Sequence, residues 1–294
     1  MRNSDLLSDF VNRAAIRSRL LRLSPLKRLR VRARDKRQRN FQSQAVEGTP
    51  ARLISSSVQD AGICLLPEAS RLGATAAAVI RDLIDQGMSA WNWGDDRDIL
   101  ETDDIFSQKP STYYLGFEPS LLDAAEDYLH EPCFYMGCSL KRERVSSSNV
   151  GPRQWHCDIE DDRMFRVILY LNSVDDGEGP FEYIDSRRSQ IAIDKLAYQS
   201  GYISDEAMRP IIRQADWISV RGPAGTTIAF DGTRVFHRVS QPITKDRFSL
   251  SLTYSSRHPR QIFRQVRLRA AMQRLLVKSL DERQRACLPA ARWI

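Results

Sequence analysis

The chain has 294 residues, 42% of them hydrophobic, so it can bury a sizeable core as one large domain or two small ones. No apolar run reaches the roughly 18 residues of a spanning helix, and no apolar segment follows the basic N-terminus, so neither a membrane span nor a secretory signal peptide is expected. The five cysteines form no CxxC pair, which favours a reduced, cytoplasmic protein without a cysteine zinc site.

The net charge of +7 is unevenly distributed along the chain. Residues 1–45 carry 13 Lys/Arg and 3 Asp/Glu, and residues 256–294 carry 10 Lys/Arg and 2 Asp/Glu. These two ends contribute +10 and +8, which leaves −11 for residues 46–255. A domain that grips a nucleic-acid backbone should itself be basic, so the acidic middle argues against that function.

Residues 1–45 are expected to form a basic arm. Leu6 and Phe10 recur at helical spacing, Pro25 interrupts the pattern, and residues 27–39 are dense in arginine. This composition predicts a solvated arm, either disordered or amphipathic. The alternative is a segment that contacts anionic lipid, nucleic acid or an acidic protein.

The main domain is expected over residues 46–258. Residues 61–67 predict a short buried strand, residues 68–87 a helix that stops at Gly87, and residues 91–111 an acidic loop. The expected buried side of the helix is Ala77, Val79, Ile80, Leu83 and Ile84.

From about residue 132 the chain becomes rich in strand patterns. Residues 188–212 predict a partly helical insertion, and residues 259–294 a basic C-terminal helix packed on the strands. The pattern favours a mainly β fold with flanking helices (α+β), built as a sandwich or jelly roll over about residues 132–256. Strands are expected at 133–144, 153–159, 164–173, 180–185, 216–221, 226–231, 234–240 and 246–254. The C-terminal helix is expected over 261–279, with Ile262, Val266, Met272, Leu275 and Leu276 facing inward.

Two segments hold candidate metal ligands. In Gln154-Trp155-His156-Cys157-Asp158, strand alternation puts His156 and Asp158 on one face and Cys157 on the other. His237 stands in an apolar strand, Val235-Phe236-His237-Arg238-Val239. Two imidazoles and one carboxylate on one face of an octahedron form the ligand set of non-haem iron(II) oxygenases, which leaves positions open for a co-substrate and O2.

A candidate anion site lies ten residues further on, at Arg247-Phe248-Ser249. Arg247 and Ser249 share one face of an alternating strand, and a buried arginine needs an anion. An arginine fork beside a serine hydroxyl fits the distal carboxylate of a dicarboxylic acid. The alternative is a surface arginine on an edge strand.

The region 60–257 resembles the phytanoyl-CoA dioxygenase-like branch of the iron(II)- and 2-oxoglutarate-dependent oxygenases. The resemblance rests on residues 154–158, on Tyr170-Leu171-Asn172, on 179–184, and on 225–232 leading to His237 and Arg247. One departure is Asp185-Ser186-Arg187-Arg188, where many relatives have a Gly-Ser-His turn.

The resemblance implies a double-stranded β-helix barrel that binds Fe(II) through His156, Asp158 and His237. It also implies that Arg247 and Ser249 hold the 5-carboxylate of 2-oxoglutarate, which O2 converts to succinate and CO2 while a substrate is oxidised. Tyr170 or Arg166 is a further candidate contact of the co-substrate. We expect long segments, 188–212 and 91–111, to roof the substrate pocket.

The expected function is a dioxygenase that hydroxylates or desaturates a small-molecule or lipid-like substrate. A demethylase or hydroxylase acting on protein or nucleic acid is the first alternative, favoured slightly by the basic ends. A non-enzymatic ligand-binding member of the fold is the second.

Overall fold

The computed structural model describes residues 32–39, 41–68, 72–94, 97–145, 149–260 and 269–288. The expected helix around Leu6 and Phe10 lies outside the described residues. So do Ile262 and Val266, which were expected to face inward from the C-terminal helix.

A short helix spans residues 32–38. The helices are α3 (Pro50–Ala61), α4 (Ala74–Gln86), α5 (Thr102–Gln108), α6 (Pro110–Tyr114), α7 (Pro119–Leu129), α8 (Ser186–Lys195), α9 (Asp205–Met208), α10 (Ala270–Ser279) and α11 (Glu282–Ala286), with 3-10 turns η2 (Met88–Ala90), η3 (Leu115–Phe117), η4 (Gly151–Arg153) and η5 (Gln214–Asp216).

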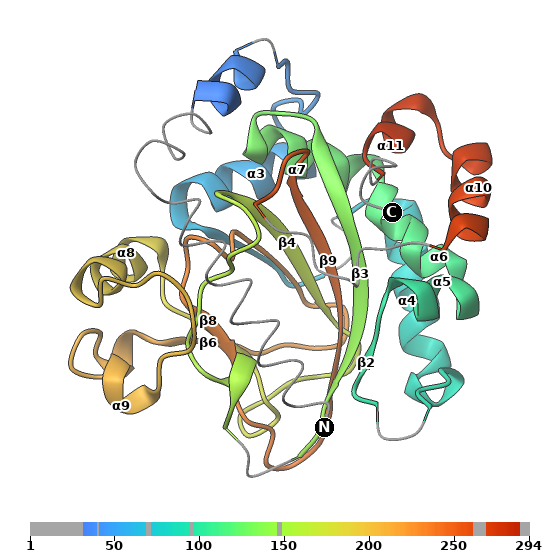
Figure 1. The fold of residues 1–294 in the computed structure, drawn as a ribbon. Helices are drawn as coiled ribbons and strands as arrows, with labels where there is room; N and C mark the ends of the chain where they lie inside the picture. The colour runs from blue at the N-terminus through green and yellow to red at the C-terminus, as the bar shows by residue number, and fades with distance from the viewer. Residues whose placement is uncertain are drawn as a thin grey trace, which may run out of the picture.

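Two antiparallel sheets lie at the centre of the molecule (Figure 1). The larger has the strand order β1-β7-β4-β9-β3-β2, and the smaller has the order β6-β5-β8. Helices and antiparallel sheets are therefore combined as the sequence indicated. The strands are β1 (Ile63–Leu66), β2 (Ile99–Leu100), β3 (Cys133–Glu143), β4 (Met164–Tyr170), β5 (Phe181–Tyr183), β6 (Ile218–Val220), β7 (Thr227–Phe230), β8 (His237–Val239) and β9 (Arg247–Ser256).

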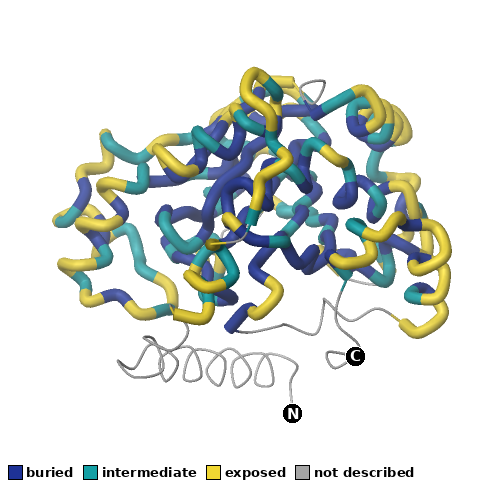
Figure 2. The backbone as a smooth tube through the Cα atoms, turned by 90° about the horizontal axis from the view of Figure 1, so that it is seen from above, coloured by how far each residue is buried: buried dark blue, intermediate teal, exposed yellow. Residues whose placement is uncertain are grey.

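Strand alternation divides the core into two layers. On β9, Leu250, Leu252 and Tyr254 belong to a large apolar cluster that they share with the helices. A second cluster lies between the sheets, where Tyr170 and Phe230 of the larger sheet meet Phe181 of the smaller. The inner face of β9 carries Arg247 and Ser249, both about 1% exposed. In Figure 2 the buried backbone is concentrated in the middle of the molecule.

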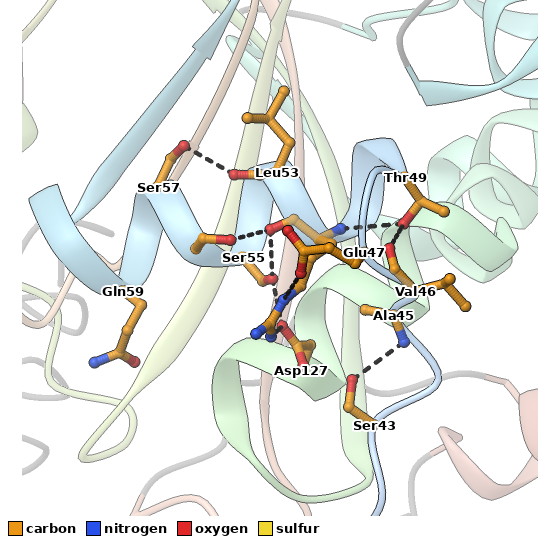
Figure 3. A network of polar contacts seen from close by, with 12 residues as sticks. Ser43, Ala45, Val46, Glu47, Thr49, Leu53, Ser55, Ser57, Gln59 and Asp127 are labelled. Carbon is orange, nitrogen blue, oxygen red and sulfur yellow. Dashed lines mark hydrogen bonds and ion pairs between the residues drawn. The ribbon is translucent and has the colours of Figure 1, made fainter.

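Helix α3 is fixed to α7 by a polar network as well as by apolar packing (Figure 3). Arg52 Nη1 donates to Asp127 Oδ2 at 2.8 Å, and the Ser55 hydroxyl donates to the same oxygen. Thr49 caps the helix by accepting from Arg52 N, and Gly62 ends it with a φ of 83°. The contact keeps the start of β1 in place beside β7.

The structure corrects several details of the sequence prediction. Residues 153–159 form no strand; they begin with the last residue of η4 and contain two isolated bridges, at Trp155 and His156. The expected loop 91–111 includes α5, which begins with a capping box between Glu101 and Asp104. Leu275 of α10 is 56% exposed, whereas Met272 and Leu276 are buried as expected. In α4 the buried residues are Ala76, Ile80 and Leu83, so Ala77, Val79 and Ile84 lie only at the margin of the buried face.

The segment that departs from the family pattern begins a helix. Asp185 caps α8 by accepting from Arg188 N at 2.8 Å. The remainder of the insertion contains α9, and Figure 1 shows both helices on the side of the small sheet, away from α4 and α10. No helix in the described part of the chain is long and apolar enough to cross a membrane.

Candidate metal centre

His156 and His237 come from segments that run side by side. They form an isolated antiparallel bridge, in which His156 N donates to His237 O at 3.1 Å and His237 N donates to His156 O at 3.0 Å. Side chains of paired residues point to the same face. The two imidazole centroids consequently lie 4.4 Å apart.

The Asp158 carboxylate lies beside the two imidazoles because Gly232 leaves room for it. Asp158 N donates to Gly232 O at 2.7 Å. A Cβ on Gly232 would lie 1.8 Å from Asp158 Oδ2, so no side chain fits at this position. One potential ligand atom each from His156, Asp158 and His237 lies within 4.8 Å of the others.

Both imidazoles are arranged to offer Nε2. The Nδ1 atom of His156 lies 2.9 Å from Gln154 O, and that of His237 lies 3.0 Å from Val235 O. Each carbonyl accepts a hydrogen from Nδ1, which leaves the Nε2 lone pair free. Burial lowers the pKa of both His156 and His237 to about 3. The positive charge of Arg166 lowers both pKa values further. Neutral imidazole is the form that binds a metal.

The carboxylate has an unused oxygen. Arg166 Nη1 donates to Asp158 Oδ1 at 3.1 Å. Asp158 Oδ2 is buried and accepts no hydrogen bond within the described residues, although Arg166 Nη1 lies 3.0 Å from it. The other oxygen, Oδ1, lies 3.8 Å from His237 Nε2, and a buried carboxylate beside two neutral imidazoles fits a divalent cation. Arg166 therefore contacts a metal-ligand candidate.

Arg247 is buried in the middle of the large sheet, which contradicts the edge-strand alternative. It is 1% exposed, and β9 pairs with β3 on one side and β4 on the other. Arg247 Nη1 donates to Gly179 O at 2.8 Å, and Nη2 lies 3.9 Å from Glu143 Oε1. Its Nε has no hydrogen-bond partner in the described part of the chain. The guanidinium thus retains capacity for an anion.

Ser249 and Tyr170 lie next to Arg247. They face each other across the β4–β9 pair. The Arg247 guanidinium lies 5.7 Å from the centre of the Tyr170 ring. The Tyr170 hydroxyl donates to Val220 O at 2.9 Å and accepts from Phe181 N at 2.8 Å. Its hydroxyl therefore ties the two sheets together, and its ring supports the arginine.

A polar cavity of about 130 Å³ adjoins the metal-ligand group. Its walls include Arg166, Glu160, Lys141, Glu101 and Ile99, the last two from the segment expected as a roof. Burial lowers the pKa of Lys141, and Arg166 acts in the same direction. Lys141 lies opposite Ser249 on the neighbouring strand. The cavity reaches the metal-ligand group only through Arg166, which contacts Asp158, and none of the three ligand candidates lines it.

Two further residues at the site come from the insertion, and local sequence gave no sign of them. The Tyr202 ring lies 5.3 Å from the His156 ring in an edge-to-face contact. Asp205 accepts from Trp155 Nε1 at 3.1 Å and from Arg238, the residues adjacent to the two histidines. The backbone pairing of Trp155 with Ile203 also holds this segment at the site. Trp155 and Phe236 are core residues, and each is fully buried.

The comparisons with known proteins concern the fold. No protein-family model matches the chain, and no curated protein matches it. The chain is similar to the solved structure of EctD from S. alaskensis with bound Fe, at 14% identity and a TM-score of 0.51, over 74% of this chain and 81% of EctD. The apoform of EctD gives 17% identity, the same coverages and a TM-score of 0.50. The likeness shows that the two chains share a fold.

Proposed function

We propose that the protein is an iron(II)- and 2-oxoglutarate-dependent dioxygenase. It would hydroxylate or desaturate a small-molecule or lipid-like substrate and release succinate and CO2. The observation that carries the proposal is the combination of His156, Asp158 and His237 in one group with a buried Arg247 on an adjacent inner face. The EctD structure with bound Fe supports the choice of metal. We also propose that the protein acts in the cytoplasm.

The residues present fit this cofactor set. Two neutral imidazoles and Asp158 would hold Fe(II) on one side and leave the other side open. Bound iron would supply O2 activation coupled to decarboxylation of 2-oxoglutarate. Arg247, with Ser249 beside it, would hold the distal carboxylate through the guanidinium nitrogen that lacks a partner. Lys141 and Arg166 add positive charge around a dianionic co-substrate.

We propose that the two sheets are the halves of a double-stranded β-helix. The small sheet carries His237, and the large sheet carries Arg247. Residues from both sheets fill the cluster that contains Tyr170 and Phe181. In this arrangement the ligands stand at the rim of the fold and the arginine stands deeper between the sheets.

The test is co-substrate turnover by purified protein with iron(II), 2-oxoglutarate and ascorbate under air. We expect succinate release that depends on iron and on O2, and that is lost in His237→Ala. A chelator such as EDTA should abolish the release. Absence of iron-dependent succinate release from folded protein, across a panel of small molecules, would reject the proposal in favour of a ligand-binding role.

A further inference from the structure

Two of the three metal-ligand candidates, His156 and His237, lie in a row of four residues across adjacent segments. Trp155 pairs with Ile203 in antiparallel fashion, which sets Tyr202 opposite His156. His156 pairs with His237, and His237 pairs with Tyr183 of β5. The row therefore runs Tyr202, His156, His237, Tyr183, and Tyr202 ends it on the insertion side.

Tyr202 is the accessible end of this row. Tyr202 is 44% exposed, whereas Tyr183 is 8% exposed. Burial raises the pKa of the Tyr202 phenol, and the carboxylates of Asp158 and Glu160 raise it further. The Tyr202 ring lies 5.3 Å from the His156 ring. The exposed ring thus borders the group where a metal would bind.

The segment that carries Tyr202 is held firmly beside His156. Trp155 N donates to Ile203 O at 3.0 Å, and Ile203 N donates to Trp155 O at 2.8 Å. Ser204 caps α9 by accepting from Ala207 N. Asp205 then binds Trp155 Nε1 and Arg238, and the Arg238 guanidinium lies 4.4 Å from the Trp155 ring centre. These contacts fix the position of Tyr202 relative to both histidines.

We propose that Tyr202 is the specificity-determining residue that the insertion contributes to the active site, where its ring forms the wall against which the primary substrate packs. This inference rests on the proposed function. It assigns the insertion a direct part in substrate binding, and it makes Asp205 the positioning residue that holds Tyr202 there.

A chemical consequence follows for the enzyme without its primary substrate. A ring that borders the open side of the iron would itself be hydroxylated. The ring C–H becomes C–OH, one oxygen atom of O2 enters the ring, the other enters succinate, and 2-oxoglutarate loses CO2. One tyrosine, one O2 and one 2-oxoglutarate thus give one dihydroxyphenylalanine, one succinate and one CO2.

The first experiment needs no turnover. Protein labelled with 3-fluorotyrosine is titrated with Mn(II) without O2, and each fluorine resonance is assigned by a Tyr→Phe variant. We expect Mn(II) to broaden the Tyr202 resonance more than that of Tyr198. Tyr198 is the matched control, because it lies in the same insertion but its hydroxyl is buried between Cys157 N and Gly201 O. Equal or weaker broadening of Tyr202 would overturn the proposal.

The second experiment maps oxidation. Protein with iron(II) and 2-oxoglutarate is exposed to 18O2 without substrate, and its peptides are sequenced by mass spectrometry. We expect one labelled oxygen on Tyr202, none on Tyr198, and no labelled ring in Tyr202→Ala. The peptide also contains Met208, so the fragment ions must place the oxygen on the tyrosine. Succinate release with Tyr202 unmodified would overturn the inference alone, whereas loss of iron-dependent succinate release would overturn the proposed function.

Discussion

Gly232 and Asp158 are in direct contact, with the glycine carbonyl accepting from the Asp158 amide at 2.7 Å and the glycine Cα facing the carboxylate. A methyl group at Gly232 would collide with Asp158 Oδ2 at 1.8 Å. The carboxylate would have to leave its place beside the two histidines. We therefore expect Gly232→Ala to lower the affinity for iron(II) by about tenfold or more, as measured by anaerobic titration. Wild-type affinity in Gly232→Ala would contradict this placement of Asp158.

The three ligand candidates should be necessary for iron binding. We expect one iron(II) per chain in anaerobically prepared protein, and loss of most of it in His156→Ala or His237→Ala, because two remaining ligands no longer close the site. His130 ends α7 away from the group and provides the control variant. The iron content of each variant is measured with a chelator dye and compared with that of the wild type. Unchanged iron content in both variants would refute the metal assignment.

Arg247 should govern affinity for 2-oxoglutarate without affecting iron. Its removal leaves a desolvated carboxylate unpaired, which costs on the order of 3 kcal/mol, or roughly a hundredfold in affinity. Arg247→Lys should also weaken binding, because an ammonium lacks the two-pronged geometry. Arg142→Ala is the matched control on neighbouring β3, where the arginine pairs with Asp246 at a partly exposed position. If Arg247→Ala kept wild-type kinetics for 2-oxoglutarate, the co-substrate assignment would be wrong, and the enzyme would use a reductant other than 2-oxoglutarate.

The two histidines make the metal-free protein sensitive to acid. Burial lowers both pKa values to about 3, whereas an unfolded histidine titrates near ~6.5. Between these values the unfolded chain binds more protons than the folded chain, so stability falls as pH falls through that range. Each histidine contributes at most about 1.4 kcal/mol per pH unit. Urea unfolding at pH 7 and pH 5 should show a smaller pH effect in the double variant His156→Gln/His237→Gln.

Asp205 should stabilise the fold as well as the site. Arg238 is 8% exposed and pairs with both Asp205 and Glu182. Asp205→Ala leaves this guanidinium with one carboxylate and Trp155 Nε1 without its acceptor, so we expect a loss of about 3 kcal/mol in unfolding free energy. Asp194→Ala, which removes an exposed contact with Gln190 in the same insertion, should have little effect. Urea unfolding of the two variants measures the difference. Equal unfolding midpoints would show that Asp205 does not stabilise the fold through Arg238 and Trp155.

Much of the strand pattern could be predicted because alternation is a local signal. The alternation predicts that Arg247 and Ser249 share one face of β9, and both are buried there. Helix α3 was missed although Thr49, Pro50 and Gly62 are the cap and stop residues of its ends. Residues 154–158 looked like a strand because their side chains alternate, but their partners are single residues from distant segments. Long-range pairing of this kind, including that of Tyr202, leaves no mark in the local sequence.

The basic arm divides into two parts with different expectations. Arg37 Nε donates to Glu131 at 2.6 Å, and Gln38 Nε2 donates to Leu129 O, so residues 32–39 contact the body of the protein. We predict that residues 1–45 are dispensable for succinate formation, and two deletions, 1–31 and 1–45, test this. We propose that removing 1–31 weakens salt-sensitive binding to anionic vesicles and leaves turnover intact.

The bridge between His156 and His237 has a consequence for biosynthesis. The two residues stand far apart in the chain, yet each supplies the other's backbone partner. During translation the segment around His156 leaves the ribosome well before β8 exists to pair with it. The metal-binding geometry can form only after most of the chain has been made, and contacts of such high sequence separation form slowly. Iron delivery would then follow synthesis of the chain, and the availability of the metal at that moment would set how much of the newly made protein becomes active.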